Sequence, residues 1–162
     1  MYNRQNSGFT LFEVLIALVV LSIGLLGLVG LQTTSLKFNQ SSYQRTQATN
    51  LAYSILDRVR VNRTVALSTT AYNLPEGSTP PTATDCSTTT CAPNALAAYD
   101  LSEWYTAVTG TLPNASAGIA ISDLPSGIRL YVVTISWDDL VWDDAAKTLD
   151  RGNTQVTVRS EI

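Results

Sequence analysis

No histidine occurs anywhere in this chain of 162 residues. The commonest general base and the commonest metal ligand of proteins are therefore both missing. The sequence also has neither a nucleophile elbow nor a phosphate-binding glycine loop. These absences argue against an enzyme, and we expect no cofactor and no metal site of the usual kinds.

Charge is also absent from one long stretch near the N-terminus. From Val14 to Leu36 there is no ionisable residue, and most positions hold Leu, Val, Ile, Ala or Gly. As a helix, this run is long enough to cross a bilayer with a hydrocarbon core of about 30 Å. Gly24, Gly27 and Gly30 lie within it at intervals of three. These small residues either allow close contact with the helix of another subunit or have no particular role.

Residues that break helices are missing over a still longer range. The chain has no proline before Pro75 and no glycine between Gly30 and Gly77. Leu51, Ile55 and Val59 recur every four residues, which is the period of an amphipathic helix. We therefore predict one helix from about residue 10 to residue 61, apolar in its first half and amphipathic in its second.

The charges are divided along the chain. Residues 32–63 are basic, with only Asp57 opposing several Lys and Arg residues, whereas residues 64–162 are acidic. Such a division suits contact between subunits or with anionic lipid headgroups. Because the larger part is acidic and basic residues are few, we expect no nucleic-acid partner.

Glu13 distinguishes three explanations of the N-terminus. A secretory signal would have a shorter apolar core followed by a small-x-small cleavage site, which is missing here. A plain membrane anchor leaves the carboxylate of Glu13 unexplained, although an acid in an apolar helix costs up to about 3 kcal/mol. Cleavage after Gly8 would place a new amino group on Phe9, four residues before Glu13, as a partner for that acid in a neighbouring subunit.

The segment Gly8-Phe-Thr-Leu-Phe-Glu13, between a short polar leader with Arg4 and the apolar run, resembles the prepilin signal of type IV pilins and type II secretion pseudopilins. The resemblance implies that prepilin peptidase cuts after Gly8 and methylates Phe9. It also implies that Glu13 neutralises a neighbour's amino group during assembly.

The next part of the chain narrows the resemblance. The pattern Gln44-Arg45, Leu51-Ala52, Asp57-Arg58 and Arg60-Val-Asn62 is similar to the stalk of PilV-type minor pilins. That family implies a subunit of the inner membrane with a periplasmic head, which initiates, assembles or modifies a type IV pilus together with other minor pilins and the major pilin. A minor pseudopilin of type II secretion is the first alternative, and an anchored periplasmic ligand-binding domain is the second.

We expect an α+β pilin-like fold, with a long N-terminal helix packed on a small antiparallel sheet. The expected parts are a leader (1–8), a membrane or filament-core helix (9–36), an amphipathic stalk helix (37–63) and a head (64–162). In the head, we expect residues 64–94 to form an irregular loop, and a helix to begin at Asp100 and stop at Gly110. We expect strands near 119–121, at 128–137 and at 154–161, with a turn at 150–153 before the last strand.

Two smaller features of the head need an explanation. Cys86 and Cys91 are separated by four residues, and in an exported domain such a pair is most simply a disulfide. A loop this short gains only about 2 kcal/mol from the cross-link, and without histidine or further cysteines a zinc site is excluded. The acidic segment Trp137–Asp144 is expected as a solvated loop with its tryptophans in the core, with a calcium site or a docking surface as alternatives.

Overall fold

The computed structural model describes residues 9–125, 127–143 and 148–162 of the chain. Contacts divide it into a first unit that ends at Gln40 and a second unit from Ser41 to Ile162. The elements in chain order are α1 (Leu11–Val61), α2 (Arg63–Ser68), α3 (Pro93–Thr111), β1 (Ser116–Asp123), β2 (Arg129–Asp143) and β3 (Thr148–Glu161). The predicted α+β architecture is confirmed, and the helix predicted for residues 10–61 is present as α1.

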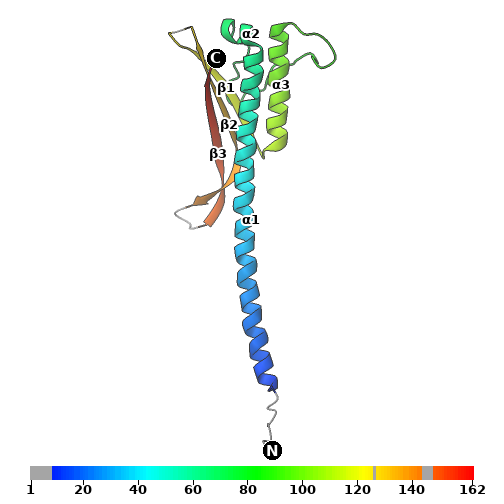
Figure 1. Cartoon of the computed structure of the whole chain (residues 1–162), viewed down its shortest axis with the longest axis vertical. Helices are drawn as coiled ribbons and strands as arrows, with labels where there is room; N and C mark the ends of the chain where they lie inside the picture. The colour runs from blue at the N-terminus through cyan, green and yellow to red at the C-terminus, as the bar shows by residue number, and fades with distance from the viewer. Residues whose placement is uncertain (1–8, 126, 144–147) are drawn as a thin grey trace, which may run out of the picture. The chain divides into compact units, whose positions relative to one another are not determined.

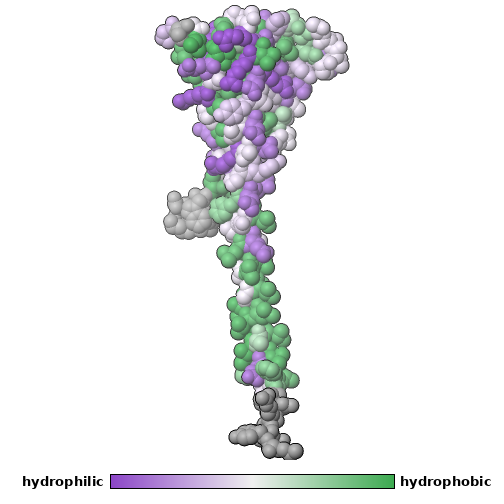
Figure 2. All heavy atoms as spheres, in the orientation of Figure 1, coloured by the Kyte–Doolittle hydropathy of each residue, from purple (hydrophilic) through white to green (hydrophobic). Residues whose placement is uncertain are grey.

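The first unit consists of the N-terminal part of α1, and its apolar side chains face outward. Phe9, Leu11, Leu26 and Leu31 are each more than two-thirds exposed. Figure 2 shows the visible face of this part as an almost continuous hydrophobic surface. By length and composition α1 can cross a membrane, and such a surface requires lipid or other apolar helices around it.

The second unit has a closed hydrophobic core. The amphipathic stripe of α1 is buried at Ala48, Ala52, Ile55, Leu56 and Val59, as the helical period predicts. Within this unit α1 lies between α3 and the sheet (Figure 1), and the indole Nε1–H of Trp104 in α3 donates 2.9 Å to the carbonyl oxygen of Leu51. One face of each element therefore builds the core.

The sheet is antiparallel, in the order β1-β2-β3. The strand expected near 119–121 is present as β1, and the alternation expected for 154–161 is present in β3. Both long strands extend further than expected. Val141 pairs with Asp150 and Asp139 with Gly152, so the predicted turn at 150–153 is wrong, and so is the predicted acidic loop from Trp137 to Asp143. Asp144, the last residue of that predicted loop, lies outside the described residues. Local turn-forming composition gave way to strand pairing at these positions.

Two further boundaries differ from the expectation. Helix α3 begins at Pro93, seven residues before the expected start, and ends at Thr111 rather than stopping at Gly110. Proline at the first helical position fits because its fixed φ matches the helix and no amide hydrogen is needed there. Residues 64–68, expected as loop, lie in the short helix α2 (Arg63–Ser68), whose Val65 and Ala66 are buried.

Candidate functional site at the start of helix α1

The first turn of α1 is closed by a reciprocal pair of side chains. The hydroxyl oxygen of Thr10 accepts a hydrogen bond from the backbone N–H of Glu13 at 3.3 Å. In return, Glu13 Oε2 accepts bonds from the backbone N–H of Thr10 at 3.2 Å and from its hydroxyl at 3.3 Å. This arrangement is a capping box, which satisfies amide groups that a helix start leaves unpaired. The spacing Thr-x-x-Glu in the sequence is the signature of this motif.

The capping box uses only part of the hydrogen-bonding capacity of the Glu13 carboxylate. Its side chain is exposed, and all its hydrogen bonds in the described part of the chain go to Oε2. A carboxylate offers about four lone-pair sites, so Oε1 stays available to another donor. The negative charge also lies in the first helical turn, where the helix dipole favours it. The side chain is thus held in place while it keeps an open acceptor.

Phe9 lies directly before this turn and is 88% exposed. A shallow hollow of about 440 Å³ runs along the same side of the helix, lined by Phe9, Glu13, Val14, Ala17, Leu18 and Leu21. The predicted processing residue Gly8 lies outside the described residues. Cleavage and methylation at Gly8 and Phe9, and the pairing role of Glu13, therefore stay predictions.

The acidic segment predicted from the sequence is part of the β2–β3 pairing. Asp138 and Asp139 point in different directions: Asp138 Oδ2 accepts 2.7 Å from Asn114 Nδ2, and Asp139 is buried against α1. Trp137 is fully buried, as expected. Among the residues that the structure describes, no three acids, histidines or cysteines converge as a metal ion would need, so the calcium alternative gains no support.

Asp100, expected to cap a helix, instead lies inside α3 at the centre of a buried polar network. Tyr72 Oη donates 2.7 Å to Asp100 Oδ2, and Arg58 Nη1 lies 3.3 Å from Oδ1. Asn62 Nδ2 donates to Tyr72 Oη at 3.2 Å and to the carbonyl oxygen of Pro93 at 2.7 Å. Burial, and then the hydrogen bond to Asp100, raise the pKa of Tyr72. The network joins the end of α1 to α3, and it reads as structural because every member has a partner.

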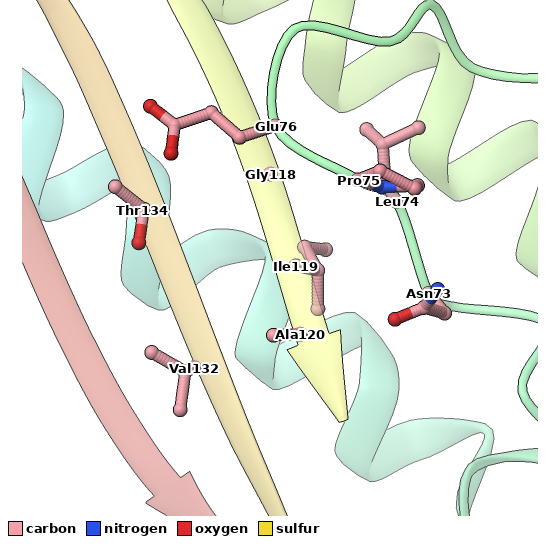
Figure 3. Close-up of a pocket in the computed structure, with 9 residues that line it drawn as sticks. All are labelled: Asn73, Leu74, Pro75, Glu76, Gly118, Ile119, Ala120, Val132 and Thr134. Carbon is pink, nitrogen blue, oxygen red and sulfur yellow. The ribbon is translucent and has the colours of Figure 1, made fainter. Parts of the chain in front are cut away.

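A groove of about 240 Å³ lies beside β1 in the head. In Figure 3, Glu76 reaches from the preceding loop across β1 at Gly118 towards Thr134. Leu74 bridges Ile119 of β1 with two backbone hydrogen bonds, at 2.7 and 2.9 Å. A Cβ atom on Gly118 would lie 2.8 Å from the Glu76 backbone nitrogen, so glycine permits this close approach. Among the described residues that line the groove, Glu76 is the only ionisable one.

The predicted disulfide between Cys86 and Cys91 is present. It closes a short loop whose Asp85 accepts hydrogen bonds from the hydroxyl and the backbone N–H of Ser87, and these bonds lower the pKa of Asp85. The cross-link therefore orders a surface loop, far along the chain from the first turn of α1.

The models of two known families match this sequence. Residues 3–29 match the prokaryotic N-terminal methylation motif, and residues 30–102 match the family described as Type IV pilin Tt1218. The two matches adjoin one another and together extend from the leader into α3. No curated protein and no solved structure gives a significant match to the chain.

Proposed function

This chain is a type IV pilin subunit with a prepilin-type methylation motif, and we propose that it is a minor pilin that initiates, assembles or modifies a type IV pilus. In this proposal prepilin peptidase removes residues 1–8 and methylates Phe9. The subunit then waits in the inner membrane with its head in the periplasm, and it joins other minor pilins and the major pilin through α1. Its role is structural.

The observation that carries the proposal is the exposed first turn of α1. Glu13 is held by Thr10, and its Oε1 accepts no hydrogen bond from the described residues, at the start of a helix whose apolar surface is exposed in the described part of the chain. Ion pairing is strongest where water is excluded, and an unpaired acid among apolar helices is costly. A neighbour's new amino group at Phe9 supplies the missing positive charge.

The assignment to minor rather than major pilins rests on the sequence pattern from Gln44 to Asn62. Most of that pattern has a structural use in the head: Ala52 lies in the core, while Arg58 and Asn62 hold the network around Asp100 and Tyr72. Because this pattern is similar to the stalk of PilV-type minor pilins, we propose that the chain has the same role as those proteins.

The first test is the mature N-terminus. Mass spectrometry of the protein from its native membrane should find a chain that begins with N-methylated Phe9. A chain that still carries residues 1–8 would contradict the proposal and would favour an anchored periplasmic ligand-binding domain.

The role of Glu13 is tested by a pair of variants. Glu13→Gln keeps the capping box, because glutamine replaces glutamate in that motif, but it removes the charge. We expect normal cleavage and a fall in filament incorporation of about tenfold, which corresponds to ~1.4 kcal/mol of lost pairing. Thr10→Ala, which weakens the cap but keeps the charge, should incorporate better than Glu13→Gln. Incorporation of Glu13→Gln at the normal level would refute the pairing role.

A minor pseudopilin of a type II secretion system is the second candidate, because the methylation motif and the apolar helix suit both assemblies. A deletion strain separates the two. Loss of pili and surface motility supports the minor pilin, whereas loss of exoprotein export with normal pili supports the pseudopilin.

A further inference from the structure

Asp139 of β2 carries a buried charge that contacts α1 at Ser41, where the second unit begins. The residue is 5% exposed. Its Oδ2 accepts a 2.7 Å hydrogen bond from the hydroxyl of Ser41 and lies 3.8 Å from Arg45 Nε. Its Oδ1 accepts 2.7 Å from the backbone N–H of Leu140. Ser41 is the first residue of the second unit, so these contacts form the first attachment of the head to its helix.

Burial of this group is costly in free energy. Arg45 is half-exposed and does not reach hydrogen-bond distance, so among the described residues the Ser41 hydroxyl and the Leu140 amide are the groups that solvate the charge. Trp137 lies two residues earlier on the same strand, and its buried Nε1–H has no partner among the described residues. A pair of well-packed apolar residues would usually be at least as stable as a buried ionic contact. The best-attested use of such polar groups is in registry or switching.

The strand segment that carries Asp139 is only half supported. Strand β1 pairs with β2 no further than Ser136, so from Trp137 onwards β2 and β3 form a ribbon of two strands. Two-stranded ribbons are marginally stable by themselves. The base of this ribbon is fixed, because the backbone N–H of Asp138 donates to the carbonyl oxygen of Pro113 and the Asp138 carboxylate accepts from Asn114.

From this geometry we propose that the ribbon formed by residues 137–143 and 148–154 is a conformational latch on α1. In the closed state, Asp139 is buried against Ser41. In the open state, the carboxylate is hydrated, the ribbon turns outward from its base, and residues 41–47 of α1 lose their contact with the head. The core from Ala48 to Val59 stays packed in both states.

On opening, Asp139 loses its hydrogen bond from Ser41 and its weak ion pair with Arg45. The free energy of these contacts is offset by hydration of the Asp139 carboxylate. Opening adds about two turns of helix, at 3.6 residues per turn, to the part of α1 that is free of the head. Under the proposed function, this freedom lets the head reorient as the subunit changes neighbours, and this last step rests on that function. The latch itself does not.

Hydrogen–deuterium exchange of the full-length protein in detergent micelles tests the latch without any filament. Ser41→Ala removes the hydroxyl and leaves the charge buried with too few partners. We expect exchange at amides 150–153 to become roughly tenfold faster, because a two-stranded ribbon that is released from α1 is only marginally stable. Amides 42–47 and 55–60 stay inside an intact helix, so their exchange should be unchanged. Ser42→Ala on the exposed side of the same turn is the matched control and should leave all of these rates unchanged.

A second variant keeps the test decisive. Asp139→Asn has nearly the same shape, still accepts from Leu140 and can donate to the Ser41 hydroxyl, but it has no charge to bury. The latch predicts that its exchange at residues 150–153 is equal to or slower than that of the unmodified protein. Unchanged exchange in Ser41→Ala, faster exchange throughout the head, or faster exchange in Asp139→Asn would each overturn the proposal.

Discussion

The two units of this chain satisfy their side chains in opposite ways. In the first unit, large apolar residues such as Leu26 are exposed along α1, and the Glu13 carboxylate keeps an open acceptor. In the second unit, Trp104, Tyr131 and their neighbours fill a core, and buried polar groups such as Asp100 have hydrogen-bond partners. The first unit depends on surroundings outside the chain, whereas the second supplies most of its own.

Under the proposed function, this difference places the assembly contacts in the first unit and most of the stability in the second. Residues whose requirements are unmet among the described residues motivate that proposal: lipid or helices would surround the apolar surface, and a positive charge would pair with Glu13. Residues whose requirements are met within the chain indicate only how the head stays folded. Substitutions that truncate or enlarge side chains in each unit test this difference between the two units.

The largest expected effect comes from the same kind of truncation in each unit. Trp104→Ala removes a fully buried side chain and its bond to Leu51, and we expect the free energy of unfolding of the head to fall by about 3–5 kcal/mol. Leu25→Ala, in the exposed stretch of α1, should leave the unfolding of the head unchanged. Thermal unfolding of the full-length protein in micelles measures both. Equal effects would show that the two units are not energetically separate.

The same division explains what the sequence predicted. In α1 the apolar run, the four-residue period and the absence of proline all favour one helix, so its extent was predicted to within a residue or two. Leu101, Trp104 and Val108 recur at helical spacing in α3, and they are buried. Periodicity is a local property and survives without knowledge of tertiary contacts.

The failures lie where distant segments decide the outcome. Asp100 reads locally as a helix cap, but Tyr72 and Arg58 hold it inside α3. The acidic segment around Asp139 reads as a loop, but pairing with β3 and contact with Ser41 make it a strand. Those partners are up to 98 residues away, and no local pattern identifies them. At the candidate site, the cap formed by Thr10 was readable from its spacing, whereas the pairing role of Glu13 stays a prediction.

A smaller effect is expected where backbone approaches backbone. Gly118→Ala would place a Cβ atom 2.8 Å from the backbone nitrogen of Glu76, so the loop must shift, at a cost of about 1–3 kcal/mol. Gly110→Ala is the matched control, because nothing lies within 4 Å of its added Cβ and alanine favours a helix. Denaturant titrations should therefore move in opposite directions. A destabilised Gly110→Ala, or a neutral Gly118→Ala, would contradict this account of the groove in Figure 3.

The smallest effect separates the units by pH. Burial raises the pKa of Tyr72 and of Tyr131 above the ordinary value near 10. A raised folded-state pKa gives stability that is fully present below about pH 10 and is lost as the pH rises towards the folded pKa.

Between pH 10 and pH 11 the free energy of unfolding of the head should thus fall by about 1 kcal/mol, because the Tyr72 phenol ionises in the unfolded chain and not in the folded chain. Thermal unfolding at the two pH values measures this loss, and Tyr72→Phe should lose less stability over the same interval. The described part of the first unit has no tyrosine, so its helical signal should be constant over this range. An alkaline transition that begins in the first unit would break the comparison, because the tyrosines that resist ionisation lie only in the folded head.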